Sequence, residues 1–130
     1  MEQAYLGVEE RKALERSYLC KTVHIGIDRP IGYVHHKEKY DLHYPINYGY
    51  IPDVLGGDGE EMDVYLLGVN EPVAEYDAHI IAIVHRENDV EDKLVGAPAG
   101  MQFSKDEIAA AVHFQEQYFD SYVEMVEEAQ

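Results

Sequence analysis

The sequence contains little cysteine, little positive charge and no long apolar run, and each absence excludes a class of protein. Cys20 is the only cysteine, so the chain has no internal disulfide and no cysteine-based zinc site. This fits a reducing compartment, and we expect a cytoplasmic protein. No apolar run approaches the ~20 residues of a membrane span. Residues 1–12 are polar and charged and lack the apolar core of a signal peptide.

Positive charge is scarce: 10 basic residues stand against 26 acidic ones, for a formal net charge of −16. Unaided binding to nucleic acid or to an anionic membrane needs a basic surface, so we expect neither partner. The acidity has two interpretations. It provides solubility, or it serves cation binding, because clustered carboxylates repel one another until a metal ion neutralises them.

The pattern of apolar residues predicts a single domain, residues 1–130, rich in short strands. Residues 8–19 predict a short helix with charged faces, and residues 33–43 are polar and irregular. Short β-prone segments recur between turn signals, at residues 22–28, 46–51, 62–69, 78–84 and 93–97. Five short strands with bends favour a small barrel or sandwich over an α/β sheet.

The C-terminal segment has the pattern of a long amphipathic helix. Ser104 and Glu107 match a capping box, in which each side chain satisfies a backbone N–H of the other residue. Apolar residues then recur in a wide stripe, at positions 108, 111, 112, 114, 118, 119, 122, 125 and 126. The sequence therefore predicts an α+β fold: a small β-barrel with a short N-terminal helix and a long C-terminal helix packed on it.

Residues 44–63, YPINYGYIPDVLGGDGEEMD, form the most informative segment. A tyrosine-rich stretch bent by glycine and proline precedes the carboxylates of Asp58, Glu60 and Asp63. Tyrosine hydroxyls can donate hydrogen bonds to phosphate oxygens, and carboxylate oxygens are natural ligands of Mg²⁺. Taken alone, the carboxylates also fit a solvated acidic turn, and their spacing excludes an EF-hand. With the tyrosines, they indicate a metal-dependent site for a phosphorylated substrate.

A second acidic stretch, residues 87–93, ends in Lys93. Taken alone, it fits a surface loop. Two acidic loops at strand ends can instead hold a cluster of Mg²⁺ ions, because each ion draws few carboxylates from the protein and completes its shell with water and substrate. Lys93 would then meet a phosphate group.

Residues 44–63 resemble the signature of family I soluble inorganic pyrophosphatases, in which Y-P-x-N-Y-G-Y-I-P precedes D-G-D-P-x-D. The resemblance runs from about Val23 to Tyr118. It implies an OB-like five-stranded barrel and Mg²⁺-dependent hydrolysis of inorganic pyrophosphate by a metal-activated water. It also implies a homo-oligomer, since bacterial members are commonly hexamers.

The resemblance assigns roles to individual residues. The metal ligands it implies are Asp58, Glu60, Asp63, Asp89 and Asp92, with Glu91 as the alternative to Asp92. The catalytic residues are Glu60, Asp63 and Tyr48, with Glu60 orienting or deprotonating the water. The substrate-binding residues are Tyr44, Tyr48, Lys93, Tyr118 and His24. Tyr118 lies in H-F-Q-E-Q-Y, which is similar to the family's H-F-F-x-x-Y, although its position also fits a core residue on a helix face.

Five positions depart from the family pattern. Glu60 replaces an Asp, His24 and Gly26 replace a Lys and a Glu, an Arg of the family falls near His36, and Phe119 replaces a Lys. Nearby cations that can compensate are His24, Arg29, His35, His36, Lys37 and Lys39. The lost lysines motivate two alternatives: a metal-dependent hydrolase of a nucleotide or another organic diphosphate, and a non-catalytic metal- or nucleotide-sensing relative.

Overall fold

The computed structural model describes residues 8–55, 61–87 and 91–125. The elements in chain order are α1 (Val8–Arg16), β1 (Thr22–Arg29), β2 (Val34–His36), β3 (Asp41–His43), β4 (Asn47–Leu55), β5 (Glu61–Leu66), β6 (Glu75–Arg86), β7 (Lys93–Ala97), α2 (Lys105–Glu116) and β8 (Ser121–Met125). Neither helix in the described part of the chain has the length and apolar character that crossing a membrane requires.

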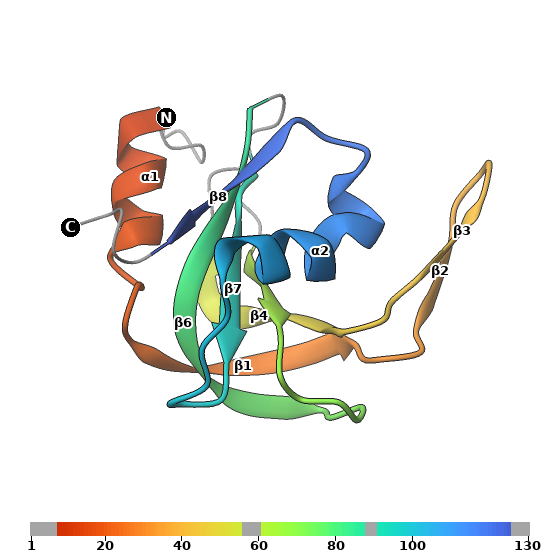
Figure 1. The fold of residues 1–130 in the computed structure, drawn as a ribbon, viewed down its shortest axis with the longest axis horizontal. Helices are drawn as coiled ribbons and strands as arrows, with labels where there is room; N and C mark the ends of the chain where they lie inside the picture. The colour runs from red at the N-terminus through yellow and green to blue at the C-terminus, as the bar shows by residue number, and fades with distance from the viewer. Residues whose placement is uncertain (1–7, 56–60, 88–90, 126–130) are drawn as a thin grey trace.

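Five strands close into a barrel, which confirms the predicted α+β fold (Figure 1). The strand order is β1-β4-β5-β7-β6-β8, and a further pairing of β1 with β6 closes the ring. β5 and β7 run parallel, whereas the other paired strands of this sheet are antiparallel. β8 adds to β6 outside the ring. Closure pairs the edges that an open sheet would expose.

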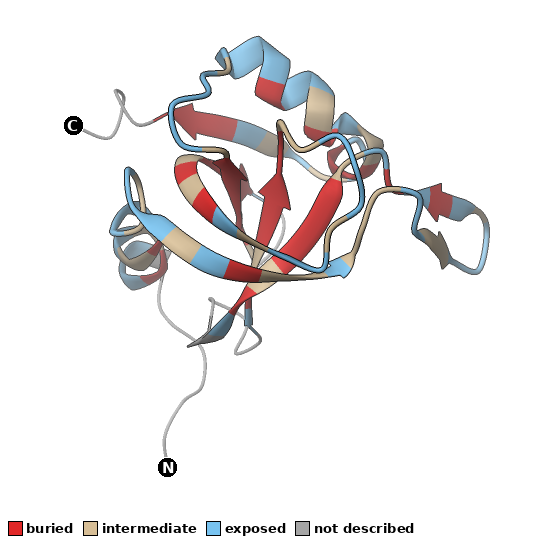
Figure 2. Ribbon diagram, turned by 90° about the horizontal axis from the view of Figure 1, so that it is seen from below, coloured by how far each residue is buried: buried red, intermediate tan, exposed pale blue. Residues whose placement is uncertain are grey.

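Two apolar clusters stabilise the fold, and β5 contributes to both. Val64 and Leu66 belong to the cluster that also contains Ile25 and Ile80, whereas Tyr65 belongs to the cluster that α2 covers. Successive residues of a strand point to opposite faces, so β5 is buried on both sides. Figure 2 shows this burial on the barrel strands and the exposed outer side of α2. This double burial explains the continuous apolar run after Asp63.

The C-terminal helix is shorter than the sequence predicts. α2 begins at the predicted capping box on Ser104 but ends at Glu116, and residues 121–125 form β8. The prediction of helix beyond Glu116 was therefore wrong. Val123 and Met125, two residues apart, reach the same cluster as Ile108 of α2. A strand paired with β6 buries these apolar residues as well as a helix would.

Two further segments differ from the prediction. β4 does not end before Pro52 but runs to Leu55, and its pairing with β5 is irregular between Tyr50 and Leu55. Proline lacks a backbone N–H, so a strand accommodates it where the ladder is interrupted. The polar segment 33–43 is not wholly irregular, since β2 and β3 form a hairpin that stands out from the barrel (Figure 1).

Gly49 allows β4 to approach β1 closely, and this gives a stability prediction. A Cβ at Gly49 would lie 1.8 Å from the carbonyl oxygen of Gly26. That atom belongs to the β1 backbone, so it cannot move without disturbing the ladder. We expect Gly49→Ala to lower the free energy of unfolding by about 3 kcal/mol, measured by denaturant titration.

The matched control for this prediction is Gly26→Ala. A Cβ at Gly26 would meet the ring of Tyr50 at 2.9 Å, and a side chain can rotate away. Gly26→Ala should therefore cost clearly less than Gly49→Ala. Equal losses in the two variants would show that the close backbone approach is not what Gly49 provides.

Candidate functional site

A pocket of about 260 Å³ opens between the strands of the barrel and the C-terminal end of α2. Its cationic lining residues are Arg29, Lys37, Arg86 and Lys93. Its acidic lining residues are Asp28, Asp63 and Glu91. The described part of this acidic chain therefore gathers more cationic than acidic side chains around one pocket. An anion meets a far more favourable field here than the net charge of −16 suggests.

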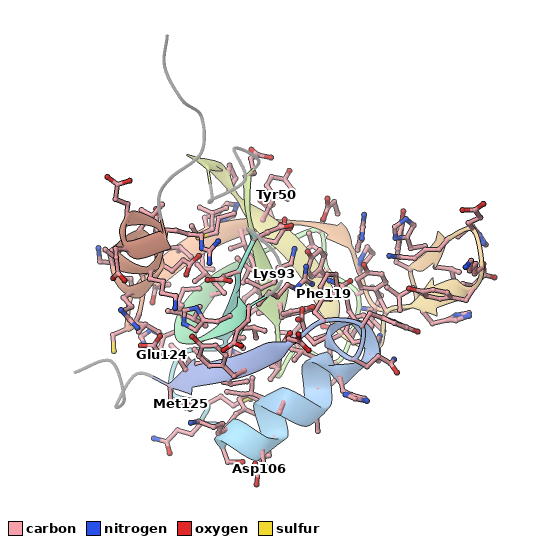
Figure 3. All side chains as sticks on the ribbon, turned by 90° about the horizontal axis from the view of Figure 1, so that it is seen from above. Tyr50, Lys93, Asp106, Phe119, Glu124 and Met125 are labelled. Carbon is pink, nitrogen blue, oxygen red and sulfur yellow. The ribbon has the colours of Figure 1, made fainter. Side chains whose placement is uncertain are left out.

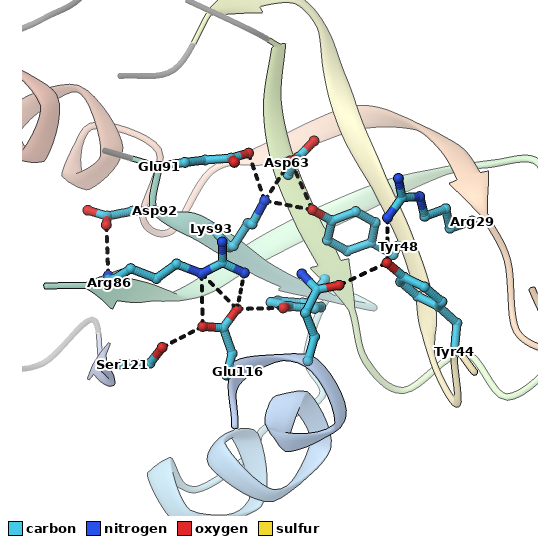
Figure 4. A network of polar contacts seen from close by, with 12 residues as sticks. Arg29, Tyr44, Tyr48, Asp63, Arg86, Glu91, Asp92, Lys93, Glu116 and Ser121 are labelled. Carbon is cyan, nitrogen blue, oxygen red and sulfur yellow. Dashed lines mark hydrogen bonds and ion pairs between the residues drawn. The ribbon is translucent and has the colours of Figure 1, made fainter. Parts of the chain in front are cut away.

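Lys93 is the centre of the pocket (Figure 4). Its side chain is only 4% exposed, and its ammonium nitrogen donates three hydrogen bonds of 2.7 Å. The acceptors are the Tyr48 hydroxyl, Asp63 Oδ2 and Glu91 Oε2. Tyr48 in turn donates to Asp63 Oδ2 at 2.9 Å. The pairing of β4, β5 and β7 as neighbours brings these residues together from distant parts of the sequence.

The two carboxylates beside Lys93 titrate in opposite directions. Burial and the nearby Asp63 raise the pKa of Glu91 to about 8, although the Lys93 ammonium opposes this. Burial alone would raise the pKa of Asp63, but hydrogen bonding to Glu91 and the charge of Lys93 outweigh it and hold that pKa below its usual value. Burial and the charge of Asp63 raise the pKa of Tyr48 well above its usual value, so Tyr48 remains a hydrogen-bond donor.

Arg29 also lines the pocket and is held by Tyr44. The Arg29 guanidinium donates to the Tyr44 hydroxyl at 2.5 Å, and that hydroxyl donates to Gln115 Oε1 at 2.8 Å. The guanidinium carbon also lies 5.8 Å from the centre of the Tyr48 ring. Tyr44 is almost completely buried, with 1% of its surface exposed. It therefore acts behind the pocket wall and orients Arg29.

Glu116 ties the end of α2 to the barrel through Arg86. Arg86 binds Glu116 through two nitrogens, with Nε 3.0 Å from Oε1 and NH2 2.7 Å from Oε2. The Tyr65 hydroxyl donates to Glu116 Oε2 at 2.6 Å, and the Ser121 hydroxyl donates to Oε1. The Phe119 ring covers the Arg86 guanidinium at 3.7 Å. The position of Arg86 in the pocket is therefore fixed on several sides.

Glu116 gives a pH-dependent stability prediction. Burial would raise its pKa, but hydrogen bonds from Arg86, Ser121 and Tyr65 outweigh burial and hold it below the usual value. A depressed pKa in the folded state contributes stability above the unfolded pKa, and this stability is lost as pH falls through the folded pKa. We expect Glu116→Gln to lower the free energy of unfolding by about 3 kcal/mol at neutral pH.

In the same variant, the free energy of unfolding should fall less steeply than in the parent as pH decreases below about pH 5, measured by urea titration. The control is Glu38→Gln, an exposed carboxylate between β2 and β3. It should retain the curve of the parent protein. If the free energy of unfolding of Glu116→Gln falls as steeply with decreasing pH as that of the parent, the prediction is contradicted.

The structure brings together part of the predicted site. Tyr48, Asp63 and Lys93 meet in the pocket with Glu91, and Tyr44 supports them from behind. Asp58, Glu60 and Asp89 lie outside the described residues.

Three other predicted residues do not line this pocket. His24 is exposed on the outer face of β1, 2.7 Å from Asp77 and 2.9 Å from Glu75. Tyr118 is 50% exposed and stacks on Tyr40 at 5.0 Å. Asp92 is fully buried on the other side of its backbone segment.

Sequence reasoning missed Arg86 as a residue of the pocket, although a signal for it was present. Arg86 ends an apolar strand, and a buried charge needs a charged partner. The partner, Glu116, stands 30 residues away. The sequence carries no pattern that joins the two.

Comparisons with known proteins agree with this fold. Residues 22–128 match the sequence model of the inorganic pyrophosphatase family. The chain is similar to the inorganic pyrophosphatase of Neisseria meningitidis serogroup A, with 42% identity over 60 residues, 42% of this chain and 33% of that protein. It is also similar to that of Haemophilus influenzae, with 40% identity over 60 residues, 42% of this chain and 34% of that protein. The matched segment thus spans about a third of these relatives.

Solved structures extend the likeness in fold to most of the chain. The inorganic pyrophosphatase of Ehrlichia chaffeensis superimposes with a TM-score of 0.65 at 19% identity, over 85% of this chain and 90% of that one. The enzyme from Neisseria gonorrhoeae gives a TM-score of 0.59 at 21% identity, over 83% of this chain and 84% of that one. With its own barrel, its tyrosine-rich strand and the match over residues 22–128, the chain belongs to the inorganic pyrophosphatase family.

Proposed function

We propose that the protein hydrolyses inorganic pyrophosphate to two phosphates with the help of Mg²⁺. The observation that carries this proposal is the arrangement around Lys93. Two carboxylates and a phenol converge on one buried cation, and further cations line the same pocket. Carboxylates for metal ions and cations for phosphate oxygens are the two parts that such a reaction requires.

The family implies a divalent metal ion, and the donors at this pocket fit one. Asp63 Oδ2 and Glu91 Oε2 lie at equal distances of 2.7 Å from the same Lys93 nitrogen, so both already face a cation. Oxygen donors of this kind suit Mg²⁺. When bound, Mg²⁺ supplies a water of lowered pKa and neutralises the charge of the leaving phosphate. We propose Asp63 and Glu91 as ligands, completed by Asp58, Glu60 and Asp89.

Glu91, rather than Asp92, is supported as the ligand of the second acidic stretch. Glu91 and Lys93 are two residues apart and meet in the pocket, where Lys93 donates to Glu91. Asp92 lies between them, and its side chain accepts the Arg86 backbone N–H and contacts His85 instead. Alternation along an extended segment explains this difference.

Arg29 and Arg86 are proposed to bind phosphate oxygens in place of the lysines absent at positions 24 and 119. Both guanidiniums line the pocket and are oriented by buried partners, Tyr44 and Glu116. Nε and Nη2 of Arg86 are engaged by Glu116, so we propose that the two guanidiniums attract a phosphate chiefly through their positive charge. Tyr48 remains protonated and donates to Asp63, so it can donate to a phosphate oxygen only by exchanging that hydrogen bond. Hydrogen bonding to Glu91 and the charge of Lys93 keep Asp63 ionised.

The size of the pocket favours a small substrate. Its volume of about 260 Å³ lies below the usual range of organic-ligand pockets, which begins at about 300 Å³. A free pyrophosphate needs less room than a nucleotide. A pocket of this volume has room for pyrophosphate, the substrate that we propose.

The test is phosphate release from pyrophosphate, compared with release from ADP, in Mg²⁺ and after chelation with EDTA. We expect rapid release from pyrophosphate in Mg²⁺, far slower release from ADP, and none after chelation. Faster hydrolysis of ADP would establish the organic-diphosphate alternative. Saturable Mg²⁺ binding without turnover would establish the non-catalytic one.

We also propose a cytoplasmic homo-oligomer, with a hexamer as the expected state. Family resemblance supports the oligomer, and the single cysteine fits a reducing compartment. Light scattering of the purified chain measures the molar mass directly.

A further inference from the structure

A second group of metal-binding side chains lies between α1 and the barrel, apart from the pocket. It consists of Glu15 on α1, His85 on β6 and Asp92 just before β7. Their side chains are 2%, 2% and 0% exposed. None of these side chains lines the pocket around Lys93. The mechanism proposed above uses none of the three.

The distances among the three side chains suit a small ion. His85 Nδ1 lies 2.9 Å from Asp92 Oδ2 and 3.8 Å from Glu15 Oε1. A tetrahedral zinc site with bonds of about 2.0–2.2 Å has donor-to-donor distances of about 3.3–3.6 Å. The observed distances lie on either side of this range. The three ligand atoms all lie within 4.8 Å of one another, so side-chain shifts of about 1 Å or less would give them a common ion.

Glu15 supplies an independent indication of a ligand. Its Oε1 atom is buried and accepts no hydrogen bond within the described residues. Burial and hydrogen bonding to Asp92 raise the pKa of Glu15 to about 9, so a cation that binds here displaces a proton. A buried carboxylate oxygen without a partner is costly. This oxygen lies 3.8 Å from His85 Nδ1. A cation held between the two side chains would satisfy it.

The far side of His85 has the arrangement expected behind a metal-bound histidine. His85 Nε2 lies 2.6 Å from Glu124 Oε1, and Arg16 Nε donates to Glu124 Oε2 at 2.8 Å. Figure 3 shows Glu124 on β8, on the side where α1 lies. Metal-binding histidines almost always donate their other ring N–H to such a carboxylate, which fixes the tautomer. On the other side of the ring, Nδ1 lies 2.9 Å from Asp92 Oδ2, and a metal ion bound between them would take the place of the proton that this hydrogen bond uses.

Arg11 is the nearest competing cation. Its Nε atom lies 3.5 Å from Asp92 Oδ2 and 3.8 Å from Glu15 Oε2. Both distances exceed the usual hydrogen-bond range, which ends at about 3.2 Å. Arg11 therefore balances part of the charge of the two carboxylates without occupying Glu15 Oε1.

We propose that Glu15, His85 and Asp92 form a binding site for a transition-metal ion, with Zn²⁺ as the test ion. A nitrogen donor combined with two carboxylates suits Zn²⁺ better than Mg²⁺ or Ca²⁺, which take oxygen donors. The two carboxylates also match the charge of a divalent ion. The role is structural: the ion joins α1 to the barrel. It also fixes Asp92, whose neighbours Glu91 and Lys93 face the pocket.

The experiment uses the full chain, stripped with a chelator and returned to excess Mg²⁺, which fills oxygen-only sites. Zn²⁺ is then titrated by calorimetry, and Co²⁺ is titrated as an absorption probe. We expect one equivalent of bound Zn²⁺ and a higher Tm. Glu15→Gln and Asp92→Asn should each weaken Zn²⁺ binding by at least about 100-fold, and Glu124→Gln by about 10- to 100-fold.

Asp63→Asn is the matched control, because it alters the pocket and not this group. It should keep the Zn²⁺ equivalent and the Tm increase. Circular dichroism checks that each variant folds, and the parent protein provides a test that needs no variant. The proposal is overturned if the parent protein binds no Zn²⁺ in excess Mg²⁺. It is also overturned if folded Glu15→Gln binds Zn²⁺ as tightly as the parent, or if Asp63→Asn loses Zn²⁺ binding to the same extent as Glu15→Gln.

Discussion

Asp63→Asn should reduce phosphate release from pyrophosphate by at least about 100-fold in saturating Mg²⁺. Asparagine keeps the size of the side chain and can still accept from Tyr48 or Lys93, so the fold should survive. It removes one of the acidic groups that line the pocket, and with it one of the negatively charged ligands that we propose for the metal ion. The initial rate of phosphate release, measured against Mg²⁺ concentration, checks this.

The Mg²⁺ dependence separates a loss of metal binding from a loss of fold. We expect the variant to need a higher Mg²⁺ concentration and to keep the circular dichroism spectrum of the parent. The control is Asp106→Asn, an exposed carboxylate in the first turn of α2, away from Lys93 and Phe119 (Figure 3). It should leave the rate within about twofold of the parent. Asp63→Asn with an unchanged rate would rule out Asp63 as a ligand.

The sequence predicted best those residues of the site that lie close together in one segment of the chain. Tyr44, Tyr48 and Asp63 lie within residues 44–63, and β4 and β5 place them side by side. Lys93 joins them through the parallel pairing of β5 with β7. That pairing is non-local: the acidic stretch 87–93 and the family resemblance both pointed to Lys93, but neither predicted its contact with Asp63.

The different directions of the Glu91 and Asp92 side chains could have been predicted from the sequence. Once Lys93 is assigned to the pocket, alternation along an extended segment places residue 91 on the same face and residue 92 on the opposite one. The structure has this arrangement, with Glu91 bound to Lys93 and Asp92 close to His85. The spacing of acidic residues alone favoured Asp92, because it ignored the direction of the side chains.

The end of α2 could not be predicted, for a different reason. The apolar positions after Glu116 fit a helical stripe and also the two-residue repeat of a strand. What decides between them is the edge of β6, which pairs with residues 121–125. Arg86 illustrates the same limit, since its partner Glu116 becomes adjacent only after β6 and α2 have packed. Local propensity is overridden where distant partners complete the burial.

Lys93→Met should strongly destabilise the protein when no divalent metal is present. Lys93 is 4% exposed and donates to Asp63 and Glu91 at 2.7 Å each. Methionine fills a similar volume but leaves two facing carboxylates without their cation. Removing one partner of a buried ion pair costs about 3–5 kcal/mol. We expect a decrease of this size in the free energy of unfolding, measured by urea titration in EDTA.

The loss should depend on pH and on Mg²⁺. With Lys93 present, the pKa of Glu91 is already about 8, and removal of the ammonium raises it further. At about pH 6 Glu91 holds a proton and Asp63 is the main unpaired charge, whereas at about pH 9 both carboxylates move toward ionisation. An acid whose folded pKa is raised destabilises the fold increasingly as pH rises between its unfolded and folded pKa values. The difference between variant and parent should therefore be larger at about pH 9.

Mg²⁺ supplies the decisive comparison, because a divalent cation bound between Asp63 and Glu91 replaces the missing charge. Added Mg²⁺ should recover part of the lost free energy in Lys93→Met and raise its Tm more than that of the parent. Lys39→Met, at an exposed lysine between β2 and β3, is the control and should lose little in either condition. If Mg²⁺ stabilises Lys93→Met no more than Lys39→Met, then Asp63 and Glu91 do not share a metal ion, and the ammonium of Lys93 serves only the fold.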